Sequence, residues 1–149
     1  MKTARELYPN HSQWYDEQYD TEPCFETISD YQPILDSFGE ILVQVDDHDY
    51  QGDSRVLYSF PSGSIGILIF GWGSCSGCDA LQNCTSYDEV DELIRDLYSS
   101  IRLYTTPEKA LEYFKTERLH DGTLYDSTGY IKIFFRKCRQ ILMRMMKND

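Results

Sequence analysis

The stretch ILVQVDDHDYQGDSRVLYSFPSGSIGILIFGW, residues 41–72, decides the fold class. It begins with a β-branched run at Ile41–Val45, which predicts a strand, and continues through a polar loop to a predicted return strand at Arg55–Phe60. Pro61–Ser64 is a turn signal, and Ile65–Trp72 is a third, nearly continuous apolar strand. Because the connections between these strands are short, we expect an antiparallel meander.

Helical patterns lie on both sides of the meander. Residues 29–38 place apolar side chains on one side of a helix that Gly39 ends. Further along the chain, Ser86 and Glu89 have the spacing of a capping box, and apolar residues follow them at helical spacing up to position 101. The remaining positions of that helix are largely acidic, so we expect its exposed face to be acidic.

The sequence predicts three more elements before the C-terminus. Residues 101–104 are expected to pair as an edge strand, and Thr106 with Pro107 begins a helix that Asp121-Gly122 ends. Residues 130–147 form an amphipathic helix in which basic residues oppose an apolar stripe of Ile131, Phe134, Phe135, Cys138, Ile141, Leu142 and Met145. We expect this stripe to dock on the chain's own sheet. A homodimer contact is the alternative, and the basic face would also suit an anionic membrane or a partner's groove.

The expected fold class is therefore α+β, in a single domain whose antiparallel sheet of three to four strands is packed by two to four helices. Residues 1–129 are expected to form an acidic domain with a partly irregular N-terminal arm. Residues 130–149 are the basic C-terminal helix, docked on the same domain or on a second copy.

The charge of the chain is strongly negative and unevenly distributed. Its 149 residues include 25 acidic and 14 basic side chains, which give a formal net charge of −11. Residues 1–53 carry 13 acids and two bases, whereas residues 130–149 carry six bases and one acid. Because this charge repels phosphates, we expect no direct binding to nucleic acid and, instead, a basic protein surface as partner.

The composition also predicts a location. No apolar run approaches the ~20 residues of a membrane span. The first residues lack the apolar core of a signal peptide, and five cysteines without a secretion signal fit a reducing compartment. We therefore expect a cytoplasmic protein with no membrane span.

Three cysteines follow the third predicted strand in a glycine-rich segment, and they allow three interpretations. A zinc site would use Cys75, Cys78 and Cys84, with Cys24, Cys138, His120 or Asp79 as the fourth ligand. A redox site would resemble the thioredoxin arrangement, in which a helix N-terminus lowers the pKa of the first thiol of C-x-x-C. In the third interpretation the segment is a structural turn whose small cysteines pack beneath the sheet.

The segment GWGSCSGCDALQ at residues 71–82, with SYDEV at 86–90 and ALEYF at 110–114, resembles a family of small acidic proteins of phages and bacteria. The resemblance covers roughly residues 50–120 and leaves out the basic tail. It implies a phage or mobile-element context. That family has no assigned function, so the resemblance implies no catalytic residues.

Two functions from different classes fit these features. The first is an acidic binding protein that inhibits a host nucleic-acid-binding protein by occupying its basic surface, as anti-CRISPR and other anti-defence proteins do. Its carboxylates would imitate a phosphate backbone, and aromatic residues would anchor the complex. The expected partner-binding residues are Trp14, Tyr15, Asp16, Glu17, Tyr19, Asp20, Asp46, Asp47, Asp49, Asp88, Glu89, Glu92 and Asp96.

The second function is a small zinc-binding or thiol-redox protein that uses the cysteine cluster. The sequence favours the binder, and predicts no enzyme activity, because no acid or base partner accompanies the cysteines. Zinc at this cluster is the one cofactor that the sequence suggests.

Overall fold

A computed structural model of the chain describes residues 1–11, 25–75, 77–121 and 129–147. The chain divides into two compact units. Unit 1 combines Met1–Phe38 with Trp72–Ser100, and unit 2 combines Gly39–Gly71 with Ile101–Asp149.

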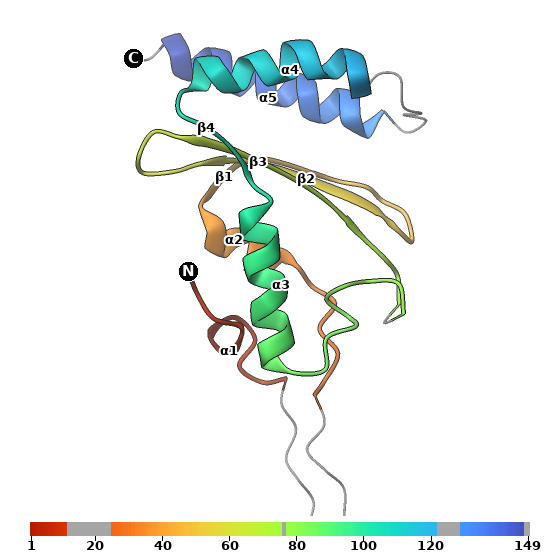
Figure 1. Ribbon diagram of the computed structural model, residues 1–149. Coiled ribbons are helices and arrows are strands. Elements are labelled where there is room, and N and C mark those ends of the chain that lie inside the picture. The colour runs from red at the N-terminus through yellow and green to blue at the C-terminus, as the bar shows by residue number, and fades with distance from the viewer. Residues whose placement is uncertain (12–24, 76, 122–128, 148–149) are drawn as a thin grey trace, which may run out of the picture. The chain divides into compact units, whose positions relative to one another are not determined.

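Unit 2 is built on a four-stranded antiparallel sheet. Its strands are β1 (Glu40–Asp46), β2 (Gly52–Ser59), β3 (Ile65–Trp72, whose last residue belongs to unit 1) and β4 (Arg102–Tyr104). They are hydrogen-bonded in the order β1-β2-β3-β4, which is their order along the chain (Figure 1). β4 pairs antiparallel with the start of β3, so the predicted meander and edge strand are confirmed. The predicted α+β class with an antiparallel sheet of three to four strands is confirmed as well.

The turn between β2 and β3 has the chemistry that its sequence predicts. The Phe60 N–H donates a hydrogen bond to the Ser64 carbonyl at 3.0 Å, which closes the turn. Gly63 lies at φ +88°, in the left-handed region where a Cβ would be strained. The glycine in Pro61–Ser64 is thus required by the turn.

Two helices of unit 2, α4 (Pro107–Asp121) and α5 (Tyr130–Lys147), lie side by side over one face of this sheet (Figure 1). Aromatic and aliphatic side chains from β1, β2, β3, α4 and α5 share one core, in which Phe114, Phe134 and Cys138 are completely buried. Each large apolar side chain buried there contributes about 1.5–3 kcal/mol. The apolar stripe of α5 therefore packs on its own chain and is not available to a membrane or a partner's groove.

Unit 1 contains α1 (Ala4–Leu7), α2 (Gln32–Phe38) and α3 (Tyr87–Ser99). The helix expected at residues 29–38 is present as α2, but it begins at Gln32 and not at Ser29, and its predicted apolar residues Ile34, Leu35 and Phe38 are buried. α1 lies in the N-terminal arm, which the sequence predicts to be partly irregular. Its Thr3 side chain caps the first turn, and its Ala4 N–H donates to Asp91 of α3 at 2.7 Å.

The start of α3 confirms the predicted cap, with one difference. The Ser86 hydroxyl accepts a hydrogen bond from the Glu89 N–H at 3.2 Å, as a capping box requires. The Glu89 carboxylate, however, reaches back to the N–H of Thr85 at 2.7 Å, one residue beyond the capping serine. Within the described ranges, no helix is long and apolar enough to cross a membrane.

Candidate functional site

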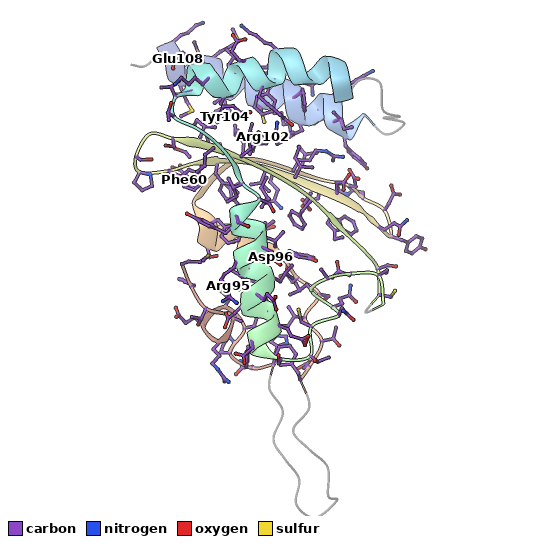
Figure 2. All side chains as sticks on the ribbon, viewed as in Figure 1. Phe60, Arg95, Asp96, Arg102, Tyr104 and Glu108 are labelled. Carbon is purple, nitrogen blue, oxygen red and sulfur yellow. The ribbon has the colours of Figure 1, made fainter. Side chains whose placement is uncertain are left out.

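The first candidate site is the exposed acidic face of α3. The four predicted binding residues on this helix, Asp88, Glu89, Glu92 and Asp96, are all exposed. Glu89, Glu92 and Asp96 are three and four residues apart, so they lie on one side of the helix. No residue in the described part of the chain forms an ion pair with any of the four. Figure 2 labels Asp96 beside Arg95, the single basic residue of this helix.

A hollow of about 170 Å³ lies along this face. It is lined by Glu89, Glu92, Leu93 and Asp96 of α3 and by Ala80, Asn83 and Cys84 of the preceding segment. The Cys84 thiol is buried and donates to the Ala80 carbonyl at 3.3 Å. Burial raises the pKa of Cys84 to about 11, and the negative charges of Glu89, Asp79 and Glu92 add to that effect. The hollow is therefore negatively charged, and its thiol stays protonated at neutral pH.

The predicted binding residues on the β1–β2 loop differ in their surroundings. Asp49 is exposed, whereas the Asp47 carboxylate lies 2.8 Å from the guanidinium of Arg55, whose side chain is 7% exposed. Asp47 also accepts a hydrogen bond from the Asp53 N–H at 2.9 Å, and Asp46 accepts from the Gln44 amide. Asp46 and Asp47 thus already have partners within the hairpin. These loop residues and α3 belong to different units.

The remaining predicted binding residues lie outside the described ranges. They are Trp14, Tyr15, Asp16, Glu17, Tyr19 and Asp20.

The second candidate site is the cysteine loop, which we define as residues 73–84, with Ser76 outside the described ranges. Cys75 and Cys78 are both exposed, and their sulfur atoms lie 2.7 Å apart. The interpretation in which these small cysteines pack beneath the sheet is therefore wrong for this pair, although Cys84 is buried. Exposed neighbouring thiols can react, whereas buried thiols are inert.

The backbone of the loop brings the two sulfurs together. A Cβ at Gly73 would lie 2.7 Å from both the sulfur and the carbonyl oxygen of Cys78, so only glycine fits there. The Cys75 N–H points at the Cys78 sulfur at 3.2 Å. Hydrogen bonding from the Cys75 thiol, supported by the Cys75 and Ser74 backbone, lowers the pKa of Cys78.

A buried carboxylate organises this loop. Asp79, 2% exposed, accepts hydrogen bonds from the Gly73 N–H, the Tyr31 hydroxyl and the Gln82 N–H, each at 3.0 Å. The Tyr31 oxygen in turn accepts from the Leu81 N–H at 3.2 Å, and burial raises the pKa of Tyr31. The sequence pattern indicated Asp79 only as a possible metal ligand and did not indicate a role for Tyr31. The Asp79–Gln82 spacing is a local signal for such a cap, but nothing local indicates Tyr31.

The structure brings the sulfur atoms of Cys75 and Cys78 together. Among the described residues, no group of three His, Cys, Asp or Glu side chains is arranged to hold a metal ion. Cys138 lies in the apolar core of unit 2, and burial raises the pKa of its thiol. Cys24 and the side chain of His120, both suggested as a fourth ligand, lie outside what the structure describes.

Comparisons with protein-family models, curated proteins and solved structures gave no match.

Proposed function

We propose that the chain is an acidic binding protein of phage type that inhibits a host nucleic-acid-binding protein by occupying its basic surface. The role would be anti-CRISPR or another form of anti-defence, and the place of action would be the host cytoplasm. The observation that carries the proposal is the row of exposed carboxylates on α3, none of which pairs with a cation in the described part of the chain. Inhibition by occupation requires no catalytic group.

The arrangement of these carboxylates favours binding over mere solubility. Like charges at helical spacing destabilise a helix by about 0.2–0.5 kcal/mol per pair, and Glu92 faces Asp88 and Asp96 at that spacing. The same number of charges dispersed over the surface would keep the protein in solution without this cost. A basic partner would neutralise these carboxylates and remove their mutual repulsion. The free energy that the repulsion costs the free helix would then favour formation of the complex.

The magnitudes indicate what the acidic face can supply. An exposed ion pair contributes about 0.2–1 kcal/mol, so four pairs give at most about 4 kcal/mol. That is too little for tight binding, but charge complementarity accelerates encounter and selects the partner. The remaining binding energy would have to come from aromatic side chains that become buried in the complex. The proposal gives this role to Trp14, Tyr15 and Tyr19.

The test uses a guide-RNA-loaded Cas9-type nuclease, whose positively charged channel holds nucleic acid. DNA binding by the nuclease is measured against increasing concentrations of the chain at low and high ionic strength. We expect inhibition that weakens as salt rises, because salt screens exposed charges. In parallel, bacteria that express the chain and carry an active CRISPR system should form more plaques with a targeted phage.

The decisive variant removes three charges from α3 and leaves the capping Glu89 in place: Asp88→Asn, Glu92→Gln and Asp96→Asn. We expect this α3 variant to lose inhibition. If it inhibits as well as the parent protein, the acidic face of α3 is not the binding surface.

A matched control removes three exposed charges elsewhere, with Glu26→Gln, Glu40→Gln and Glu108→Gln. Glu108 is labelled in Figure 2, at the start of α4. The control has the same net charge as the α3 variant and should inhibit like the parent. Equal loss in both variants would mean that net charge alone, and not its placement, is responsible.

A further inference from the structure

We propose that Cys75 and Cys78 form a reversible dithiol–disulfide couple in which Cys78 is the attacking thiol and Cys75 the resolving thiol. This activity is independent of the proposed binding function, which does not use Cys75 or Cys78. The oxidising substrate is a disulfide of a small thiol or of a protein.

The geometry of the cysteine loop supports the couple. The two sulfurs are exposed and 2.7 Å apart, and a disulfide bond is about 2.05 Å long, so only a small movement separates the reduced from the oxidised form. Gly73 permits the close approach of Cys78 to the backbone, where any Cβ would collide. The Asp79 carboxylate stabilises the loop through three hydrogen bonds, none of which involves either sulfur.

The same loop distinguishes the roles of the two thiols. Cys78 receives the hydrogen bond of the Cys75 N–H at 3.2 Å, and in the contact between the two sulfurs, where either thiol could donate, the Cys75 thiol is the donor once Cys78 is a thiolate. Both contacts stabilise a thiolate on Cys78, and the pKa of Cys78 is lowered accordingly. The thioredoxin comparison predicted the opposite order, because it relied on a helix N-terminus at the first cysteine. Here turns follow the motif, and α3 begins only at Tyr87.

The chemistry balances with the substrate disulfide as the only co-reactant. The Cys78 thiolate attacks one sulfur of R–S–S–R′, forms the mixed disulfide Cys78–S–S–R and releases R′–S⁻, which takes up a proton from solvent. The Cys75 thiol then loses its proton to solvent and attacks the Cys78 sulfur, and R–S⁻ leaves and is protonated. In total, the dithiol loses two electrons and two protons, and the substrate gains both as two thiols.

The experiment equilibrates the full chain with buffers that contain glutathione and glutathione disulfide at varied ratios. Thiols are then alkylated and mapped by peptide mass spectrometry, so all five cysteines are followed at once. We expect Cys75 and Cys78 to become protected together, as one two-electron transition, while Cys84 and Cys138 remain reduced. The proposal would be overturned if the pair failed to oxidise at every glutathione ratio. It would also be overturned if Cys75 or Cys78 formed a disulfide with Cys24 instead.

Two single variants test the assigned roles. Cys75→Ser keeps a hydroxyl donor beside Cys78 and should accumulate a stable mixed disulfide with glutathione on Cys78. Cys78→Ser should leave a Cys75 thiol that reacts several-fold more slowly with the same reagent at neutral pH. The reverse order of reactivity would overturn the assignment of the attacking thiol.

Folding and metal content are measured on the same samples. Because both thiols are exposed, each variant should unfold at the same temperature as the parent, and a similar melting curve excludes misfolding as the cause of a rate change. Stoichiometric zinc that blocks both thiols and is lost in either variant would show a metal site and overturn the redox couple.

Discussion

A single buried carboxylate determines the shape of the cysteine loop. Asp79 is held by two backbone N–H groups and the Tyr31 hydroxyl, and Tyr31 also accepts from the Leu81 N–H. The tyrosine thus satisfies two buried polar groups at once. Leaving a buried donor or acceptor without its partner costs about 1–3 kcal/mol, more than a hydrogen bond contributes on average.

The variant Tyr31→Phe keeps the ring and removes only the hydroxyl. We expect it to lower the free energy of unfolding by about 1–2 kcal/mol, because Asp79 loses a donor and Leu81 loses an acceptor. Urea denaturation followed by fluorescence measures the change. Tyr98→Phe is the control: the Tyr98 side chain is 45% exposed, and its loss of a hydroxyl should change stability by less than about 0.5 kcal/mol. Equal losses of stability in the two variants would show that the hydrogen bonds of Tyr31 with Asp79 and Leu81 do not stabilise the protein.

Buried thiols make the stability of the chain sensitive to alkaline pH. The pKa of Cys84 is raised to about 11 in the folded protein, so between its unfolded value of about 8.5 and 11 the folded state binds more protons than the unfolded state. The contribution of Cys84 to the free energy of unfolding is therefore fully present below that unfolded value and decreases as pH rises towards 11. Denaturation curves between pH 7 and 11 should show this decrease.

Other buried groups add to this slope with the same sign. Burial raises the pKa values of Cys138, Tyr8 and Tyr31 as well. Cys84→Ala removes one of the four groups, so its curve should fall less steeply with pH while keeping the direction. If stability rose with pH, or if Cys84→Ala had the parent's slope, the buried Cys84 thiol would not be a cause of the alkaline decrease.

At the scale of elements, the β1–β2 hairpin contains a buried ion pair. The Arg55 side chain is 7% exposed, and Asp47 neutralises it at 2.8 Å, with Asp53 at 3.6 Å as a weaker second partner. Removing one member of a buried pair costs about 3–5 kcal/mol. Because Asp53 remains, we expect Asp47→Ala to destabilise the protein by about 2–4 kcal/mol.

The neighbouring acid provides the control for this prediction. Asp49 is exposed, so Asp49→Ala should change the free energy of unfolding by less than about 0.5 kcal/mol. Thermal denaturation of both variants, followed by circular dichroism, makes the comparison. If the two variants melt alike, the Arg55–Asp47 pair does not hold the hairpin, and Asp47 becomes free to serve a partner.

Elements that depend on local periodicity could be predicted from the sequence, and those that depend on distant contacts could not. The bounds of α5, the strand Ile65–Trp72 and the Ser86 cap agree with the prediction, because each is fixed by side-chain spacing within the element. α1 has only four residues, too few to show a period, and its contact with Asp91 joins positions 87 residues apart.

The same distinction applies to the candidate sites. The acidic face of α3 follows from spacing, and it was predicted correctly as exposed. The Tyr31–Asp79 hydrogen bond joins residues 48 positions apart, and the partner of Asp47 depends on the hairpin register. An excess of carboxylates in the sequence does not show which ones are already paired.

At the scale of the whole molecule, charge is the dominant physical property. The net charge of −11 implies self-repulsion in the folded chain, which salt screens as the Debye length falls from about 30 Å at 0.01 M to about 8 Å at 0.15 M. Salt should therefore stabilise the free protein while it weakens the proposed complex. A protein whose charge serves only solubility shows the first effect without the second.

The stability of the free chain tests this account. We expect the unfolding temperature to rise by about 2–4 °C between roughly 10 and 150 mM NaCl, which corresponds to about 1 kcal/mol for a chain of this size. The pair Glu92→Gln and Asp96→Asn removes a like-charge contact one turn apart, and it also removes a carboxylate near the unfavourable C-terminal end of α3. This double variant should melt higher than the parent at low salt and depend less on salt. An unfolding temperature that falls with salt would mean that attractive ion pairs dominate, and the acidic face of α3 would then not be an unpaired surface waiting for a cationic partner.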